Sequence, residues 1–109
     1  SFGYAQRLNT LYYDKAYTDS LSRVIQTTKN DSIKAFNAFK LADLYRKNKN
    51  MSAFRQYLKI GNQFAATSPY LKDSGIYYNA LEYAVKNDPN RYAAGMKAAL
   101  QKLKKYRLI

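Results

Sequence analysis

Apolar residues recur along this chain at helical spacing, and they alternate between two kinds of segment. One kind is apolar around nearly its whole circumference, which is typical of a helix packed on two sides. The other kind has one apolar stripe opposite a polar face, which is typical of a half-exposed outer helix. Residues 31–48 and about 71–87 are of the first kind, and residues 51–67 and 89–106 are of the second. The pattern therefore predicts an order of inner, outer, inner and outer helices.

A shorter helix precedes these four, from about Asp19 to Lys29, and a helix over residues 8–17 is left open. With only four Gly and two Pro, the chain lacks the turns that many short strands would need. Acidic residues stand at the expected helix starts: Asp19, Asp31, Asp73 and Asp88. A carboxylate there accepts backbone N–H groups and opposes the helix dipole. We expect an all-α fold of about five helices.

Two stretches of the chain match when the sequence is shifted by 39 positions, because residues 41–48 overlay residues 80–87 without a gap. Carried forward, the shift superimposes the two predicted outer stripes. It places Ala53, Tyr57, Ile60, Gly61 and Phe64 on Tyr92, Met96, Ala99, Leu100 and Leu103. A fixed period of this size is typical of a helical solenoid. We therefore expect an α-solenoid of antiparallel helix pairs, with repeat units at about residues 31–68 and 70–107.

Each pair in such an array leaves an apolar face for the next pair, and about three repeats are normally needed for stability. This chain supplies two pairs and a leading helix, and its last residues are Arg107, Leu108 and Ile109. No polar capping helix is in view there. We expect the array either to continue in a longer protein, which is the favoured interpretation, or to self-associate through its open C-terminal end.

The alternation resembles the tetratricopeptide repeat, in which a large apolar, a small and an aromatic residue mark the first helix. Small and aromatic residues four apart mark the second. The residues that carry the resemblance are Leu41, Ala42 and Tyr45 in the first helix and Ala53, Tyr57 and Gly61 in the second. The period found here is longer than that of this repeat, which is roughly 34 residues. The resemblance implies a right-handed stack of helix pairs that binds a protein or peptide through its inner surface.

The segments Asn30–Ala35 and Leu41–Tyr45 also resemble repeat regions of certain bacterial two-component sensor histidine kinases. In those proteins such a region follows a signal peptide and precedes a membrane helix. The resemblance covers roughly residues 6–109 as a single helical repeat domain. It implies an extracytoplasmic input module, with the kinase itself beyond Ile109.

The first five residues allow two interpretations, an ordinary N-terminus, which is favoured, and the remnant of a signal peptide. Gly3 and Ala5 are small residues at the spacing that a signal peptidase reads. If residues 1–5 are a signal-peptide remnant, the protein is periplasmic, which is also the location that the sensor-kinase resemblance implies. A cytoplasmic location is the alternative.

The composition excludes several classes of chemistry. His and Cys are absent, so thiol nucleophiles, imidazole bases and Cys or His metal sites are excluded. Asp43 and Glu82 are mid-helix acids, but their matching repeat positions favour structural contacts over catalysis. No apolar run approaches the length of a membrane span, which is roughly 18 residues, so this segment is not expected to insert in a membrane. We expect no enzyme activity, no cofactor and no metal.

The net charge is +12, from 19 Lys and Arg against 7 Asp and Glu. Candidate residues for an interaction surface are Tyr77, Tyr78, Arg55, Lys59, Lys97, Lys104 and Lys105. Tyrosine is favoured at contact surfaces. Tyr12–Tyr13 and Tyr77–Tyr78 are adjacent pairs, and because adjacent residues of a helix point to different sides, one of each pair is expected in the core. The leading hypothesis is a non-catalytic scaffold for a protein or peptide. The alternative is a basic module that binds nucleic acid through phosphate contacts and base stacking.

Overall fold

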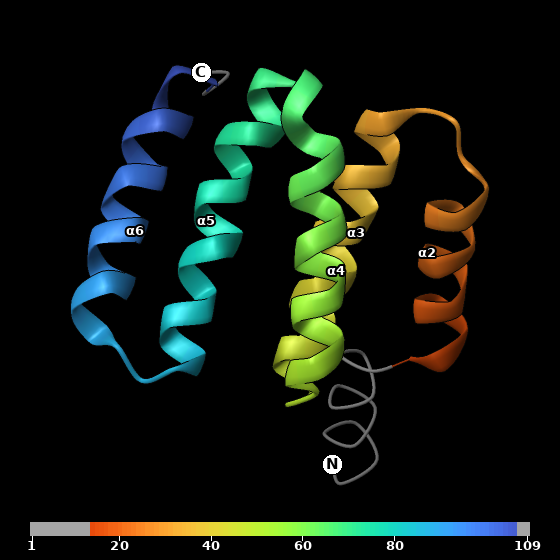
Figure 1. Ribbon diagram of the computed structural model, residues 1–109, viewed down its shortest axis with the longest axis horizontal. Helices are drawn as coiled ribbons and strands as arrows, with labels where there is room; N and C mark the ends of the chain where they lie inside the picture. Colours follow the sequence, from red (N-terminus) through yellow and green to blue (C-terminus); the bar gives the residue numbers. More distant parts are fainter. Residues whose placement is uncertain (1–13, 107–109) are drawn as a thin grey trace, which may run out of the picture.

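The computed structural model describes residues 14–106, and this part of the chain is built from helices with no β-strand. The helices are α2 (Lys15–Thr27), α3 (Asp31–Lys47), α4 (Met51–Phe64), α5 (Pro69–Val85) and α6 (Pro89–Leu103), and short 3-10 helices η1 (Ala65–Thr67) and η2 (Lys104–Tyr106) follow α4 and α6. Consecutive helices run antiparallel and lie side by side (Figure 1). The all-α prediction and the stack of antiparallel helix pairs are confirmed.

Each helix starts behind a side chain that accepts backbone N–H groups of its first turn. The N-cap residues are Asp14, Asn30, Asn50, Ser68 and Asp88. Each accepts a hydrogen bond of between 2.9 Å and 3.3 Å from an N–H two or three residues ahead. Asp88 is therefore a cap as predicted, whereas Asp31 is the first helical residue behind its cap.

Two of the acids expected at helix starts lie inside helices instead. Asp14 caps α2, so Asp19 lies in the second turn, where its carboxylate is 2.9 Å from Lys15 Nζ. Ser68 caps α5, so Asp73 also lies one turn further along than predicted. In both cases a polar side chain just upstream binds the first free N–H groups, and the helix begins earlier.

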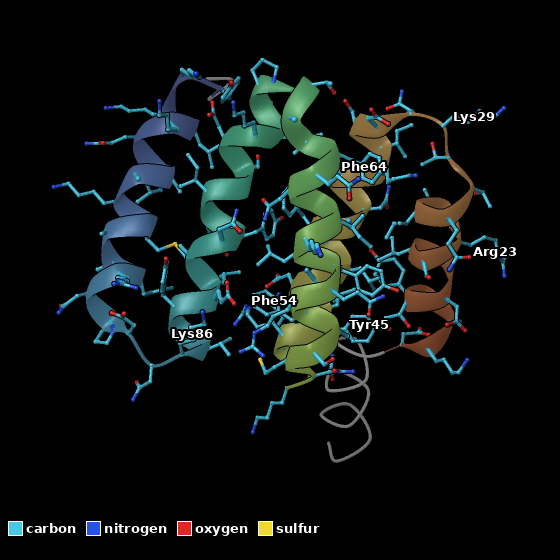
Figure 2. The ribbon with its side chains drawn as sticks, viewed as in Figure 1. Arg23, Lys29, Tyr45, Phe54, Phe64 and Lys86 are labelled. Atoms are coloured by element: carbon cyan, nitrogen blue, oxygen red, sulfur yellow. The ribbon has the colours of Figure 1, made fainter. Side chains whose placement is uncertain are left out.

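The core lies where α3, α4 and α5 meet. Phe39 of α3 is 1% exposed and stacks on Tyr78 of α5, with ring centroids 4.9 Å apart and 4° between the ring planes. Gly61 of α4 lies against the same ring. Phe54 points from α4 toward α5 and is fully buried (Figure 2). On its other side α3 packs against α2.

The buried stripe of α4 lies about one residue from its predicted position. Its buried members are Phe54, Leu58 and Gly61, continued by Ala65 of η1. The predicted members Ala53, Tyr57, Ile60 and Phe64 are only half-buried. In α6 the stripe consists of Tyr92, Met96, Ala99 and Leu103. Leu100, predicted to belong to it, is 72% exposed.

These positions correct the period of the repeat. The starts of α3 and α5, the N-caps Asn50 and Asp88, and the left-handed residues Lys49 and Asn87 are all separated by 38 positions. The observed stripes of α4 and α6 also match at 38. The shift of 39 holds only within α3 and α5, where residues 41–42 and 80–81 are buried alike. Each residue along a helix adds a rotation of about 100°. The period of 39, one residue too long, therefore assigns Leu100 to the buried stripe, whereas the structure exposes it to solvent.

Candidate interaction surface

An exposed apolar surface lies on α3 and α5, on the sides that the other described helices leave uncovered. We call it the inner face. Its exposed large side chains are Ile33 (46%), Phe36 (52%), Tyr70 (50%) and Tyr77 (37%). Spacings of three and seven residues place the two members from each helix on one side of that helix. Two inner helices therefore present apolar and aromatic side chains to the same region of solvent.

Two adjoining hollows lie in this surface. An open hollow of about 300 Å³ separates the starts of α3 and α5, with Ile33, Phe36 and Tyr70 in its walls. A narrower cavity of about 40 Å³ shares Phe36 and Tyr70 and reaches Phe39 and Tyr78. The wider hollow is lined mainly by apolar surface, so it is suited to an apolar side chain rather than an ion.

The structure separates the two adjacent tyrosines. Tyr78 is half-buried against Phe39, and burial, aided by the negative charge of Asp43, raises the pKa of its hydroxyl. Tyr77 is exposed on the inner face, where its ring meets Tyr78 edge to face with centroids 5.1 Å apart. One tyrosine belongs to the core and the other to the surface, as adjacent positions on a helix predict.

A cation lies at the edge of the inner face, between Tyr17 of α2 and Phe36 of α3. Lys40 Nζ is 5.6 Å from the ring centroid of Tyr17 and 5.7 Å from that of Phe36. These separations are within the range of a cation–π contact. Lys40 has no ion pair with any residue between 14 and 106. The inner face can therefore attract a carboxylate as well as bury an apolar group.

Arg55 and Lys59 lie elsewhere, beside a hollow of about 250 Å³ between α4 and α5. The Arg55 side chain is 3.4 Å from the Glu82 carboxylate. The amides of Asn62 and Asn79 donate to one another at 2.8 Å. Most polar groups around this hollow already satisfy one another, so it is an interhelical contact more than a binding site.

The remaining candidate lysines belong to the last helix. Lys97 and Lys104 are exposed, and nitrogen-tipped side chains of α6 extend away from α5 (Figure 2). Lys105 is instead held 3.2 Å from the carboxylate of Asp73, which also accepts a hydrogen bond of 3.0 Å from the Tyr106 hydroxyl. The residues singled out from the sequence are thus spread over three surfaces and do not form one site.

The mid-helix acids take part in ion pairs. Asp43 lies 3.2 Å from Lys47, and Glu82 lies 3.5 Å from Lys86, each pair spanning four residues near a helix C-terminus. Such pairs stabilise a helix locally. Among residues 14–106, no group of three or more acids could hold a metal ion. No helix in this range is long and apolar enough to cross a membrane.

Ile33, Phe36 and Tyr70 were not among the residues singled out from the sequence. The sequence pattern predicts Ile33 and Phe36 to be core residues of a helix packed on two sides. The spacing of apolar residues along the sequence indicates that a helix is apolar on all sides. It does not indicate whether another helix covers each of those sides. Their exposure depends on the distance between α3 and α5, which is a property of the assembled fold.

No family model, curated protein or solved structure matches this chain. A proposal of function therefore rests on the geometry and chemistry of the surfaces described above.

Proposed function

We propose that this chain is a non-catalytic module that binds a segment of another protein along its inner face. The observation that carries the proposal is the exposed pair Phe36 and Tyr70, which line two adjoining hollows, with exposed Tyr77 packed edge to face on Tyr78 of the narrower one. Single exposed apolar residues are normal on proteins, but a contiguous patch is typical of an interaction site. Aromatic residues also supply much of the binding energy at protein interfaces.

The shape of the hollows supports a peptide ligand. The wider hollow measures about 300 Å³ and adjoins the narrower one of about 40 Å³. Such a space suits a single apolar side chain better than a large cofactor. Lys40 lies at the edge of the aromatic cluster, where it can pair with a carboxylate of the same ligand. The proposed ligand is a peptide segment with an apolar anchor and a nearby acidic residue.

We further propose that this module is the extracytoplasmic input region of a bacterial sensor histidine kinase. The support is the sequence resemblance over Asn30–Ala35 and Leu41–Tyr45 together with the stacked helix pairs. A ligand held between α3 and α5 would bias their packing, and an attached segment would transmit that change.

Nucleic-acid binding is less well supported. Stacking on bases needs aromatic rings close to the cations that contact phosphates. Here Phe36 has Lys40 beside it, but Lys97 and Lys104 lie on α6 and the turn that follows it, not on the inner face with its exposed rings. A titration with DNA and RNA at several salt concentrations tests this alternative, because affinity from phosphate contacts falls steeply with salt.

The test of the inner face begins with selection of peptides from a random displayed library against the wild-type chain. Selected peptides are then measured against a Phe36→Ser/Tyr70→Ser variant and against Arg55→Ala/Lys59→Ala as the matched control. Both pairs are exposed, so circular dichroism should show unchanged helix content. We expect the first variant to lose about tenfold or more in affinity, or about 1.4 kcal/mol, and the control to retain it. Peptides that bind both variants equally would contradict the proposal.

A further inference from the structure

The last helix has one long side without a neighbour among the described helices. α4 packs against both α3 and α5, whereas α6 is the last of the described α-helices and packs mainly on α5 (Figure 1). The period of 38 shows which part of α6 corresponds to the contact of α4 with α5. Around that contact the second helix of the first pair presents Arg55, Leu58, Asn62 and Ala65. The corresponding residues, Ala93, Met96, Leu100 and Leu103, are here called the open face of α6: Ala93 and Leu100 are exposed, whereas Met96 and Leu103 are half-buried and border the stripe that packs on α5.

The open face is more apolar than the contact to which it corresponds. In α4, Arg55 pairs with Glu82 and Asn62 pairs with Asn79, so polar groups hold the two helices together. In α6 the positions that correspond to Arg55 and Asn62 are occupied by the apolar residues Ala93 and Leu100. Leu100, at 72%, has the largest exposed fraction of any large apolar residue described. An apolar surface has thus replaced a polar contact at the place where another helix fits.

The spacing of the open face suits a helix rather than a strand or loop. Successive intervals of three, four and three residues from Ala93 to Leu103 form the apolar seam of a coiled coil. Lys97 and Lys104 each follow a seam residue and lie seven positions apart. At about 1.5 Å per residue they stand about 10 Å apart along one flank of the seam. Charged residues at such flanking positions determine which partner helix is accepted.

The charge of α6 indicates what that partner carries. From Pro89 to Tyr106 the chain has five cations and no acid. Two of them have acidic partners: Arg91 Nε lies 3.6 Å from the carboxylate of Asp88, and Lys105 Nζ lies 3.2 Å from that of Asp73. Lys97 and Lys104 have no ion pair with any described residue. A covering helix without acids would leave both lysines partly desolvated and unpaired, which is unfavourable.

We propose that the open face of α6 binds an amphipathic helix of another protein, with two acidic residues seven positions apart beside its apolar seam. The apolar seam covers Ala93 and Leu100, and the two carboxylates pair with Lys97 and Lys104. A second copy of this chain is a less suitable occupant, because its own α6 would bring lysines toward lysines. This site is separate from the inner face, and neither proposal depends on the other.

The test uses three synthetic helical peptides with one shared apolar seam and with Glu, Gln or Lys at the two flanking positions. Fluorescence anisotropy at low salt measures their binding to the wild-type chain. We expect the Glu peptide to bind about tenfold or more tightly than the Gln peptide. Leu100→Ser should weaken both. The double variant Lys97→Glu/Lys104→Glu should reverse the order and prefer the Lys peptide, a gain that unfolding could not produce.

Arg55→Glu/Lys59→Glu is the matched charge reversal on α4, and it should leave the peptide preference unchanged. Phe36→Ser/Tyr70→Ser should do the same, which keeps this result distinct from a failure of the inner-face proposal. Equal binding of the Glu and Gln peptides, no binding of either, or no reversal would overturn the proposal. Binding to phosphatidylglycerol vesicles or duplex DNA that requires both lysines, without Glu-peptide binding, would also overturn it. So would a dimer in sedimentation equilibrium that Leu100→Ser abolishes.

Discussion

Phe39 and Tyr78 lie face to face, with ring centroids 4.9 Å apart and 4° between their planes. They occupy equivalent positions in the two inner helices under the shift of 39, so the repeat packs one copy of a residue on the other. Gly61 brings the third helix to this pair, because a Cβ there would lie 2.6 Å from the Phe39 ring. Helices α3, α4 and α5 therefore meet at the Phe39 ring.

Gly61→Ala should destabilise the fold, although alanine favours a helix by about 0.5–1 kcal/mol over glycine. A Cβ cannot lie 2.6 Å from ring atoms, so the Phe39 side chain or α4 must move. We expect a net loss of about 1–3 kcal/mol in the free energy of unfolding, measured by urea denaturation. Phe39→Leu in the same background should recover part of it.

Gly75→Ala is the matched control for that substitution. Its added Cβ would lie 3.2 Å from the tip of the same ring, a contact that small movements relieve. The loss should be clearly smaller than for Gly61→Ala. Equal losses would show that helix α4 does not approach Phe39 as described.

Phe54→Ala and Tyr57→Ala distinguish the observed stripe of α4 from the stripe predicted by the sequence. Phe54 is fully buried, whereas Tyr57 is half-buried and stacks on Tyr45 with centroids 5.7 Å apart. Truncation of a buried aromatic costs about 3–5 kcal/mol. We expect a loss in that range for Phe54→Ala and a smaller one for Tyr57→Ala in the same urea experiment. A larger loss for Tyr57→Ala than for Phe54→Ala would instead support the buried stripe predicted from the sequence.

The sequence was sufficient for the helix order because the evidence for it is local. Apolar periodicity separates inner from outer helices, and Asn87-Asp88-Pro89 marks a turn by its residue types alone. Which residues of α4 face the core could not be predicted in the same way. Phe54 and Tyr57 both fit a helical stripe, and the choice depends on where Phe39 of another helix meets Gly61. The exposure of residues on the inner face likewise depends on how far apart α3 and α5 lie.

Asp73 should make the stability of the second helix pair dependent on pH. The hydrogen bond from Tyr106 and, less strongly, the contacts with Lys105 lower the pKa of Asp73 below its ordinary value of 3.8. A lowered pKa in the folded state stabilises the fold above the unfolded-state pKa and loses this contribution as pH falls through the folded-state value. The difference in Tm between wild type and Asp73→Asn should therefore be full near pH 7 and shrink progressively as the pH falls below the ordinary value of 3.8.

Tyr106→Phe isolates the hydrogen bond in that arrangement. It should raise the pKa of Asp73 toward its ordinary value, as measured by carboxyl NMR titration, while Lys105 stays in place. Asp19→Asn, which removes an exposed pair within α2, is the control for a lost acid. A pKa of Asp73 unchanged in Tyr106→Phe would rule out the hydroxyl as the main cause.

Gly95→Ala should loosen α6 alone. A Cβ at Gly95 would lie 2.7 Å from the Cβ of Ala80, so the two helices must separate, and Ala80 has no flexible side chain that can yield. Because α6 packs mainly on α5, its amides should exchange faster than those of α3, which has neighbours on both sides. Hydrogen exchange should show protection falling further in residues 89–103 of Gly95→Ala while α3 is unchanged. A uniform loss across both helices would instead mean that the array unfolds as one cooperative unit, in which α6 is as firmly held as the core.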